Sequence, residues 1–196
     1  ALLSTSVCTK TNNEALVAAA GNGHTECVRM LISVSNTEWD NHAALRAALH
    51  NGHISCLRVL VELSDQTDAL LWVAEHGHAD IVQILLTQRR PWTETATIAL
   101  GAAAELGHVE CVRLLIPFSD AKRRESEPLR VAAEEGHMAC VAALLPVSNP
   151  KAMRSMALQN AVVRGHTAVV DFLWGVSDVA AALRALKMRT TADKWL

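Results

Sequence analysis

The sequence predicts an all-α solenoid, a stack of about six short helix-turn-helix repeats joined by short inter-repeat loops. The first observation is the pair Gly-His, which recurs at intervals of 25 to 30 residues along the 196-residue chain. The second is that a Leu stands eight residues before each of these histidines, and a Cys or an aliphatic residue stands three residues after it. Six copies that agree in three columns indicate repeats that bury their core against their neighbours. The histidines are His24, His53, His78, His108, His137 and His166.

The first helix of each repeat is anchored by the Leu. We expect a Ser, Thr or Asn three residues earlier to cap it, because such side chains accept bonds from free helical N–H groups. Small residues three and four positions after the Leu, such as Ala103 and Ala104, share one face and let the next helix approach closely. The Gly of Gly-His ends the helix in the left-handed conformation. The expected caps are Asn13, Thr67, Thr97, Ser126 and Ser155.

The second helix carries one apolar stripe, with Glu and Arg on its outer side, as in residues 110–116. It is expected to end at a Ser-Asp or Ser-Asn turn such as Ser119-Asp120. Trp174 occupies the same column as Ile32 and Ile116, which predicts core or semi-core packing. Helices this short are marginal alone, so stacking must stabilise them.

We interpret residues 1–196 as one array. Leu2-Leu3 precede the first anchoring Leu at the spacing of a second helix, so residues 1–10 are read as the end of a truncated upstream repeat. Six repeats are assigned to residues 11–178. Residues 179–196 start a seventh first helix at Leu183 but lack Gly-His and carry basic side chains, which predicts a polar C-terminal cap.

The composition excludes several classes of function. A formal net charge of −2 gives no basic excess for binding a nucleic-acid backbone. No apolar run reaches the roughly 18 to 20 residues of a membrane helix, and no glycine-rich phosphate loop follows a strand. We therefore expect no nucleic acid, membrane, small-molecule substrate or cofactor, and no catalytic residue.

A zinc site is the main chemical alternative, because a Cys follows Gly-His in four repeats. The spacing is His-x-x-Cys once per repeat, without the paired Cys-x-x-Cys that gathers four ligands. The same column holds Ile81 and Val169, which cannot bind a metal. We therefore expect no metal, and thiols without a disulfide framework indicate a reducing compartment, the cytoplasm. The thiols interpreted as small buried hydrophobic residues are Cys27, Cys56, Cys111 and Cys140.

These columns resemble the ankyrin repeat, whose helix pair reads as an anchoring Leu, two Ala, Gly-His and then a Val-Val and Leu-Leu helix. The resemblance covers residues 11–178 with three departures. The family's Thr-Pro survives only as Pro128, and the His after the Leu is replaced, for example by Leu71 and Gly101. A Ser-Asp or Ser-Asn turn replaces the β-hairpin and shortens the period to about 29 residues. Degenerate arrays of this kind resemble those of intracellular bacterial effectors, which would act in a host cytoplasm.

The resemblance implies a protein-binding strip on the concave side, formed by the inter-repeat loops and the two residues before each Gly-His. These pairs vary between repeats while the core columns hold, as expected of a face that is free to specialise. Tryptophan and arginine in the loops have the composition of a binding hot spot, and acidic pairs beside basic loops favour a partner of mixed charge. The predicted partner-binding residues are Trp39, His50, Asn51, Trp72, Glu75, His76, Arg89, Arg90, Trp92, Glu105, Leu106, Arg123, Glu134, Glu135 and Arg164.

The predicted function is therefore a protein–protein interaction module, a scaffold that is not an enzyme. The alternative is a substrate-targeting domain of a larger enzyme or effector whose catalytic domain lies upstream. A purely structural spacer is a third hypothesis, but a spacer does not need tryptophans in its loops.

Overall fold

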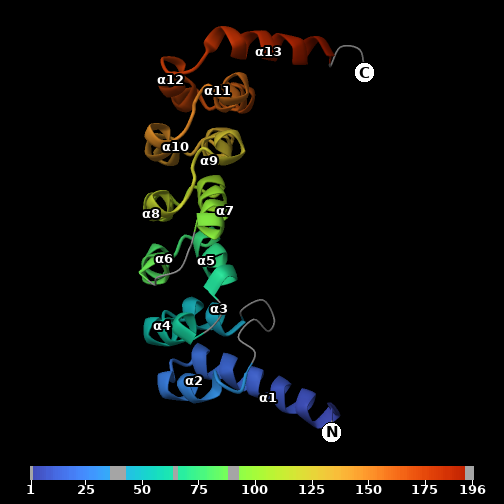
Figure 1. Cartoon of the computed structure of the whole chain (residues 1–196), viewed down its shortest axis with the longest axis vertical. Helices are drawn as coiled ribbons and strands as arrows, with labels where there is room; N and C mark the ends of the chain where they lie inside the picture. The colour runs from blue at the N-terminus through green and yellow to red at the C-terminus, as the bar shows by residue number, and fades with distance from the viewer. Residues whose placement is uncertain (1, 36–42, 64–65, 88–92, 193–196) are drawn as a thin grey trace. The chain divides into compact units, whose positions relative to one another are not determined.

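The computed structural model describes residues 2–35, 43–63, 66–87 and 93–192, and within these ranges it forms 13 α-helices and no strand (Figure 1). The helices up to residue 87 are α1 (Leu2–Gly21), α2 (Thr25–Leu31), α3 (Ala43–His50), α4 (Ile54–Leu63), α5 (Gln66–Glu75) and α6 (Ala79–Leu86). Those that follow are α7 (Thr93–Glu105), α8 (Val109–Leu115), α9 (Arg123–Glu134), α10 (Met138–Leu144), α11 (Ala152–Arg164), α12 (Thr167–Trp174) and α13 (Val179–Ala192). Two short 3-10 helices, η1 (Ile116–Phe118) and η2 (Leu145–Val147), extend α8 and α10.

The predicted all-α solenoid of helix-turn-helix repeats is confirmed. Up to α12 the odd-numbered helices are the first helices of the repeats and the even-numbered helices are the second. The six anchoring Leu residues are all buried, as a core column requires: Leu16, Leu45, Leu70, Leu100, Leu129 and Leu158. Within the described ranges, no helix is both long and apolar enough to cross a membrane.

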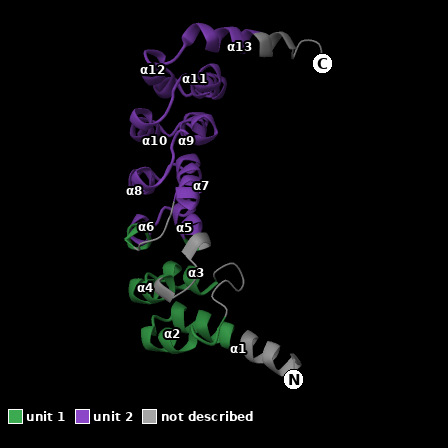
Figure 2. Ribbon diagram, viewed as in Figure 1, with its two compact units in different colours: residues 1–69, 83–88 green, residues 70–82, 89–196 purple. Residues whose placement is uncertain are grey.

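The chain forms two compact units (Figure 2). Unit 1 comprises residues 1–69 and 83–88, and unit 2 comprises residues 70–82 and 89–196. In unit 1, α1 packs against α2 and α3, and α4 packs against α2 and α3. α1 runs without a break from Leu2 to Gly21, so the helix start expected at Asn13 is wrong; Asn13 lies inside this helix and is buried. The single array over residues 1–196 stays a prediction.

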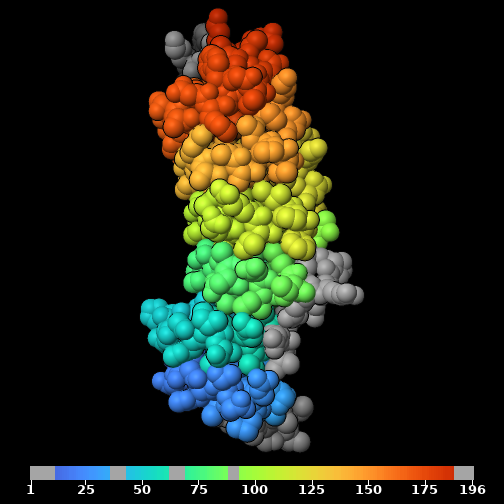
Figure 3. Space-filling view, turned by 90° about the vertical axis from the view of Figure 1, so that its left-hand side faces the viewer, coloured from blue at the N-terminus to red at the C-terminus, as the bar shows by residue number. Residues whose placement is uncertain are grey.

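In unit 2 the first helices pack in chain order, α7 on α9, α9 on α11 and α11 on α13. The second helices do the same, α8 on α10 and α10 on α12. In the space-filling view each of these repeats forms one band of surface stacked on the next (Figure 3). Every repeat therefore contributes one helix to each of two faces, and we call the side formed by α5, α7, α9 and α11 the first-helix face.

The hydroxyls predicted to cap first helices bond elsewhere, so this prediction is wrong. The side-chain oxygens of Thr97, Ser126 and Ser155 accept the backbone N–H of the turn residue that follows the second helix of the same repeat. The donors are Asp120, Asn149 and Asp178, at 2.9, 2.8 and 2.8 Å. A part-buried turn N–H is stabilised by a partner, and these hydroxyls satisfy it across 23 residues of chain. The side chain of Thr67 lies outside the described residues.

The repeats of α9 and α11 begin with a left-handed turn of three residues, at 124–126 and at 153–155, where φ lies between 47° and 61°. The residue after the anchoring Leu reaches back to this turn. Gln159 Nε2 donates to the carbonyl oxygen of Arg154 at 2.8 Å, and Arg130 Nη2 donates to that of Arg124 at 3.5 Å. α7 has Gly101 in this column and no residue with positive φ.

Two side chains predicted to pack in the core are exposed, and so is Leu183, where a seventh first helix was expected to start. The cysteine of each second helix faces the second helix of the preceding repeat, as Cys56 of α4 faces Thr25 of α2 (Sγ to Oγ1, 3.4 Å). Cys27 lies on the surface because no described second helix precedes α2. Trp174 is 48% exposed because the core position of α12 is taken by the preceding Leu173. Leu183 is 51% exposed, since its neighbour Ala182 is the residue of α13 that faces the core.

Candidate functional site

The Gly-His turns join successive repeats of unit 2 through one repeated hydrogen bond. The Nε2–H of His108 donates to the carbonyl oxygen of Glu75 at 2.9 Å, and His137 donates in the same way to Glu105 at 2.9 Å. His166 donates to the carbonyl oxygen of Glu134 at 2.8 Å. Because a carbonyl can only accept, these bonds place the proton on Nε2. We call this bond the rung. The structural role predicted for these histidines is confirmed here.

The rung explains why the turn residue is glycine. Gly77 and Gly136 have φ of 76° and 78°, a left-handed conformation in which L side chains are strained. A Cβ atom added to Gly77 would lie 2.6 Å from Nδ1 of His108, and one added to Gly136 would lie 2.5 Å from Nδ1 of His166. The histidine ring can reach the carbonyl only because the glycine has no side chain.

Each rung fixes the backbone of the residue two positions before the glycine and leaves its side chain to project. Glu75, Glu105 and Glu134 occupy this position, and all three belong to the predicted strip. In unit 1 the matching carbonyl, that of Gly21, accepts a bond from Asn51 Nδ2 at 2.8 Å. Asn51 therefore joins two repeats of unit 1, and His50 beside it is exposed.

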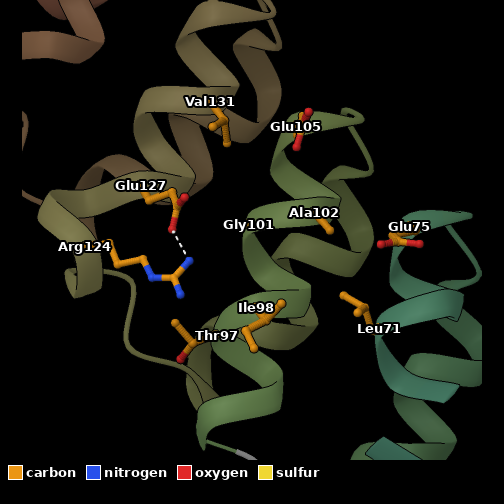
Figure 4. Close-up of a pocket in the computed structure, with 10 residues that line it drawn as sticks. All are labelled: Leu71, Glu75, Thr97, Ile98, Gly101, Ala102, Glu105, Arg124, Glu127 and Val131. Carbon is orange, nitrogen blue, oxygen red and sulfur yellow. Dashed lines mark hydrogen bonds and ion pairs between the residues drawn. The ribbon is translucent and has the colours of Figure 1, made fainter. Parts of the chain in front are cut away.

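A hollow of about 230 Å³ lies on the first-helix face of unit 2 (Figure 4). We call it the α7 hollow, because α7 supplies half of its lining. Glu75 and Glu105 lie at one end, and Ile98 lies toward the other. A Cβ atom added to Gly101 would have no atom within 4 Å, so the missing side chain leaves open space. The lining residues are Leu71, Glu75, Thr97, Ile98, Gly101, Ala102, Glu105, Arg124, Glu127 and Val131.

The charges around the α7 hollow do not cancel. Arg124 forms an ion pair with Glu127 at 3.4 Å (Nη1 to Oε2). Among the residues that the structure describes, the carboxylates of Glu75 and Glu105 have no ion pair or hydrogen bond. Three carboxylates and one guanidinium line the hollow, which leaves two negative charges without a counter-ion among the described residues of its lining.

Farther along the same face, the acidic residues of the strip are paired within the chain. Arg164 Nη2 lies 2.7 Å from Oε1 of Glu134 and 3.8 Å from Oε1 of Glu135. Asn160 Nδ2 donates to the second oxygen of Glu134 at 3.0 Å. The hydrogen bond to Glu134 raises the pKa of Arg164. Glu134, Glu135 and Arg164, predicted as separate contact residues, form one cluster.

Trp72 packs against two histidines. Its ring stacks on His76, with centroids 4.2 Å apart, and more distantly on His78, at 6.3 Å. His76 is exposed, and its Nδ1 donates to the carbonyl oxygen of Trp72 at 2.8 Å. Burial lowers the pKa of His78, with smaller lowering contributions from His76 and His108, and Asp80 opposes the shift. Trp72 therefore combines packing with partial exposure.

The other predicted contact residues are dispersed. Arg123 pairs with Glu94, whose pKa is lowered chiefly by this hydrogen bond. Leu106 is 52% exposed beside Glu105. Trp39, Arg89, Arg90 and Trp92 lie outside the described residues.

Sequence reasoning missed most of the α7 hollow, whose lining includes Leu71, Ile98, Gly101 and Val131. The sequence did carry one signal. Gly101 is the only glycine in the column after the anchoring Leu, where the other repeats have Val17, Arg46, Leu71, Arg130 and Gln159.

The thiols have the environment of core residues. Cys111 and Cys140 are buried, and burial raises the pKa of Cys111 to about 11 and that of Cys140 in the same direction. Protonated thiols are poor nucleophiles and poor metal ligands. Within the described ranges, no three His, Cys, Asp or Glu side chains gather in a group that could hold a metal ion.

Comparison with known proteins gives one family. The family model for ankyrin repeats in three copies matches residues 1–68, 61–125 and 100–179. The matched ranges overlap and run through α1 to the start of α13. No curated protein matches the chain.

Proposed function

Because this chain belongs to the ankyrin repeat family, whose members generally serve as protein–protein interaction modules, we propose that it binds a partner protein through the first-helix face of unit 2. The observation that carries the proposal is the α7 hollow. It lies on a face whose backbone the rungs hold in place, so its side chains project from a fixed frame. A preorganised surface binds with less loss of conformational entropy than a mobile one.

The exposed side chains near the hollow suit this role. Ile98 and Leu106 are 45% and 52% exposed on α7 and in the turn after it. Trp72 presents part of its ring one helix away, on α5. Apolar and aromatic side chains that are exposed and surrounded by charges are typical of the core and rim of a protein interface.

The test compares two matched variants. Ile98→Arg places a charge on the first-helix face, and Phe118→Arg places the same charge after the second helix of the same repeat. The two side chains are similarly exposed, at 45% and 42%, so both variants should fold and melt like the wild type. Each protein is immobilised, and the proteins captured from a lysate of the cells that make it are quantified by mass spectrometry.

We expect at least one protein to be captured by the wild type and by Phe118→Arg, and to be depleted at least tenfold by Ile98→Arg, about 1.4 kcal/mol of lost affinity. Calorimetry with that purified protein then measures the affinity directly. A partner that is lost with Phe118→Arg and retained with Ile98→Arg would place the contact on the second helices and refute the proposal.

A further inference from the structure

The α7 hollow has the size of a side chain rather than of a ligand molecule. Its volume of about 230 Å³ is below the roughly 300 to 1,000 Å³ of small-molecule sites. The residues that α7 contributes to its lining run from Thr97 and Ile98 past Gly101 to Glu105 (Figure 4). An occupant would therefore have an apolar part beside Ile98 and a polar end at the glutamates.

The charge at that end selects the occupant. Glu75 and Glu105 come from successive repeats, and their backbones are held by the rungs to His108 and His137. Their carboxylates have no counter-ion among the described residues. The one guanidinium of the lining, that of Arg124, is paired with Glu127. Complementary charge is the principal source of specificity at such a surface.

We infer that the α7 hollow receives a lysine or arginine side chain of the partner protein. The methylene stem lies along Ile98 and the open surface at Gly101, and the cationic head lies between Glu75 and Glu105. Long basic side chains bury their stems on apolar surface while their heads remain at polar groups. The inference rests on the proposed function, since it names the chemistry of the partner at that same site.

Other side chains fit the hollow less well. A purely apolar side chain would remove water from two carboxylates and give them no partner, which is unfavourable. An acidic side chain would be repelled by them. The cluster at Glu134 offers no equivalent site, because Arg164 and Asn160 already bind that carboxylate.

The probes are capped amino acids added to the ¹⁵N-labelled 196-residue chain, with the amide signals of Gly101 and Ala102 followed by NMR. N-acetyl-lysine methylamide and N-acetyl-arginine methylamide should shift these signals saturably, with a Kd of about 1 to 10 mM for ligands of this size. N-acetyl-norleucine methylamide has the stem without the charge, and it should bind at least fivefold more weakly. N-acetyl-glutamate methylamide should not saturate.

The variants test the two carboxylates. E75Q/E105Q removes both charges and should weaken the two basic probes at least fivefold. The control E110Q/E26Q removes two exposed carboxylates from second helices, where each has an arginine three residues away, and should leave probe binding unchanged. Equal binding of the norleucine probe, unchanged binding to E75Q/E105Q, or saturation by the glutamate probe would each overturn the inference.

The purified partner separates this inference from the proposed function. If its affinity depends on Ile98 but not on Glu75 and Glu105, the partner binds the first-helix face, and the inference that a basic side chain enters the hollow is refuted. If its affinity depends on Phe118 and not on Ile98, the proposed function itself fails. Support for both requires a tenfold loss with Ile98→Arg and at least a fivefold loss with E75Q/E105Q.

Discussion

The repeat of α7 and α8 differs from the two repeats that follow it, although the histidine of all three forms the same rung to the preceding repeat. α7 begins as an ordinary right-handed helix and has Gly101 after its anchoring Leu. α9 and α11 begin with left-handed turns, and Arg130 and Gln159 reach back to them. Where α7 lacks such a side chain, the surface is hollow.

The acidic residues follow the same division. Glu105 on α7 has no counter-ion among the described residues, whereas Glu134 on α9 is bound by Arg164 and Asn160. The two glutamates have the same backbone position and the same rung. The same backbone position can therefore carry a glutamate that is paired within the chain or one that has no counter-ion among the described residues. Only the second kind is available to a partner.

The largest expected effect on stability concerns the Gly-His turns and rungs that the repeats share. Gly77→Ala and Gly136→Ala should each lower the free energy of unfolding by about 2 to 4 kcal/mol, from the left-handed backbone, the displaced histidine ring and its lost bond. Gly165→Ala is the control, because Gly165 has φ of 77° but no atom within 4 Å of its added Cβ. It should cost only about 1 to 2 kcal/mol. Urea denaturation measures all three, and equal costs would mean that the histidine contact contributes nothing.

A smaller effect of opposite sign is expected at the hollow. Gly101 lies inside α7 with open space at its Cβ position. Gly101→Ala should therefore raise the free energy of unfolding by about 0.5 to 1 kcal/mol, because alanine is the better helix former. Thermal melting checks the sign. A destabilised variant would indicate that the column at α7 is tightly packed and that the hollow is closed.

The paired and free glutamates should differ by less. Glu134→Gln loses the charge partner of Arg164, a partly exposed pair, and should lower the melting temperature only slightly. Glu75→Gln has no intramolecular charge partner to lose among the described residues and should be neutral in stability. Comparing the two melting curves at low and at 0.5 M salt tests the division, because salt should reduce only the cost at Glu134. A salt-sensitive cost at Glu75 would show that its carboxylate is paired.

The smallest effect is a pH dependence in the repeat before α7. Burial lowers the pKa of folded His78 below its ordinary value of 6.5. As pH falls through 6.5 the unfolded chain binds a proton that the folded protein resists, so stability decreases toward acid pH. His78→Gln should flatten this part of the stability profile between pH 7 and pH 5.5. An unchanged slope of stability against pH would mean that other groups cause this pH dependence.

The sequence predicted the features that repeat. Gly-His turns, buried Leu columns and alternating helices follow from local periodicity, because each copy must bury the same face against the next. The rung was predicted only as a structural role, since its acceptor, such as Glu75 for His108, belongs to the preceding repeat.

The predictions that failed concern residues whose hydrogen-bond or ion-pair partners lie far away in the sequence. Thr97 looks like a helix cap, but its hydroxyl meets the N–H of Asp120, which local reasoning does not reach. Glu134 and Glu105 have the same type and spacing, and what separates them is the presence of Asn160 and Arg164, 26 and 30 residues after Glu134. The hollow arises because Gly101 has no side chain and because the side chains of the neighbouring helices leave the space beside it open. The residue type at position 101 alone could not predict it.

The rung also bears on how such a chain can change its length. Each rung joins one repeat to the next through the same two atoms, a ring nitrogen and a carbonyl oxygen, as at His137 with Glu105 and His166 with Glu134. Duplicating or deleting one such repeat in frame would recreate an identical junction on either side. Gene duplication can thus lengthen the protein without inventing a new junction, while point substitutions at exposed positions give each added repeat its own selectivity.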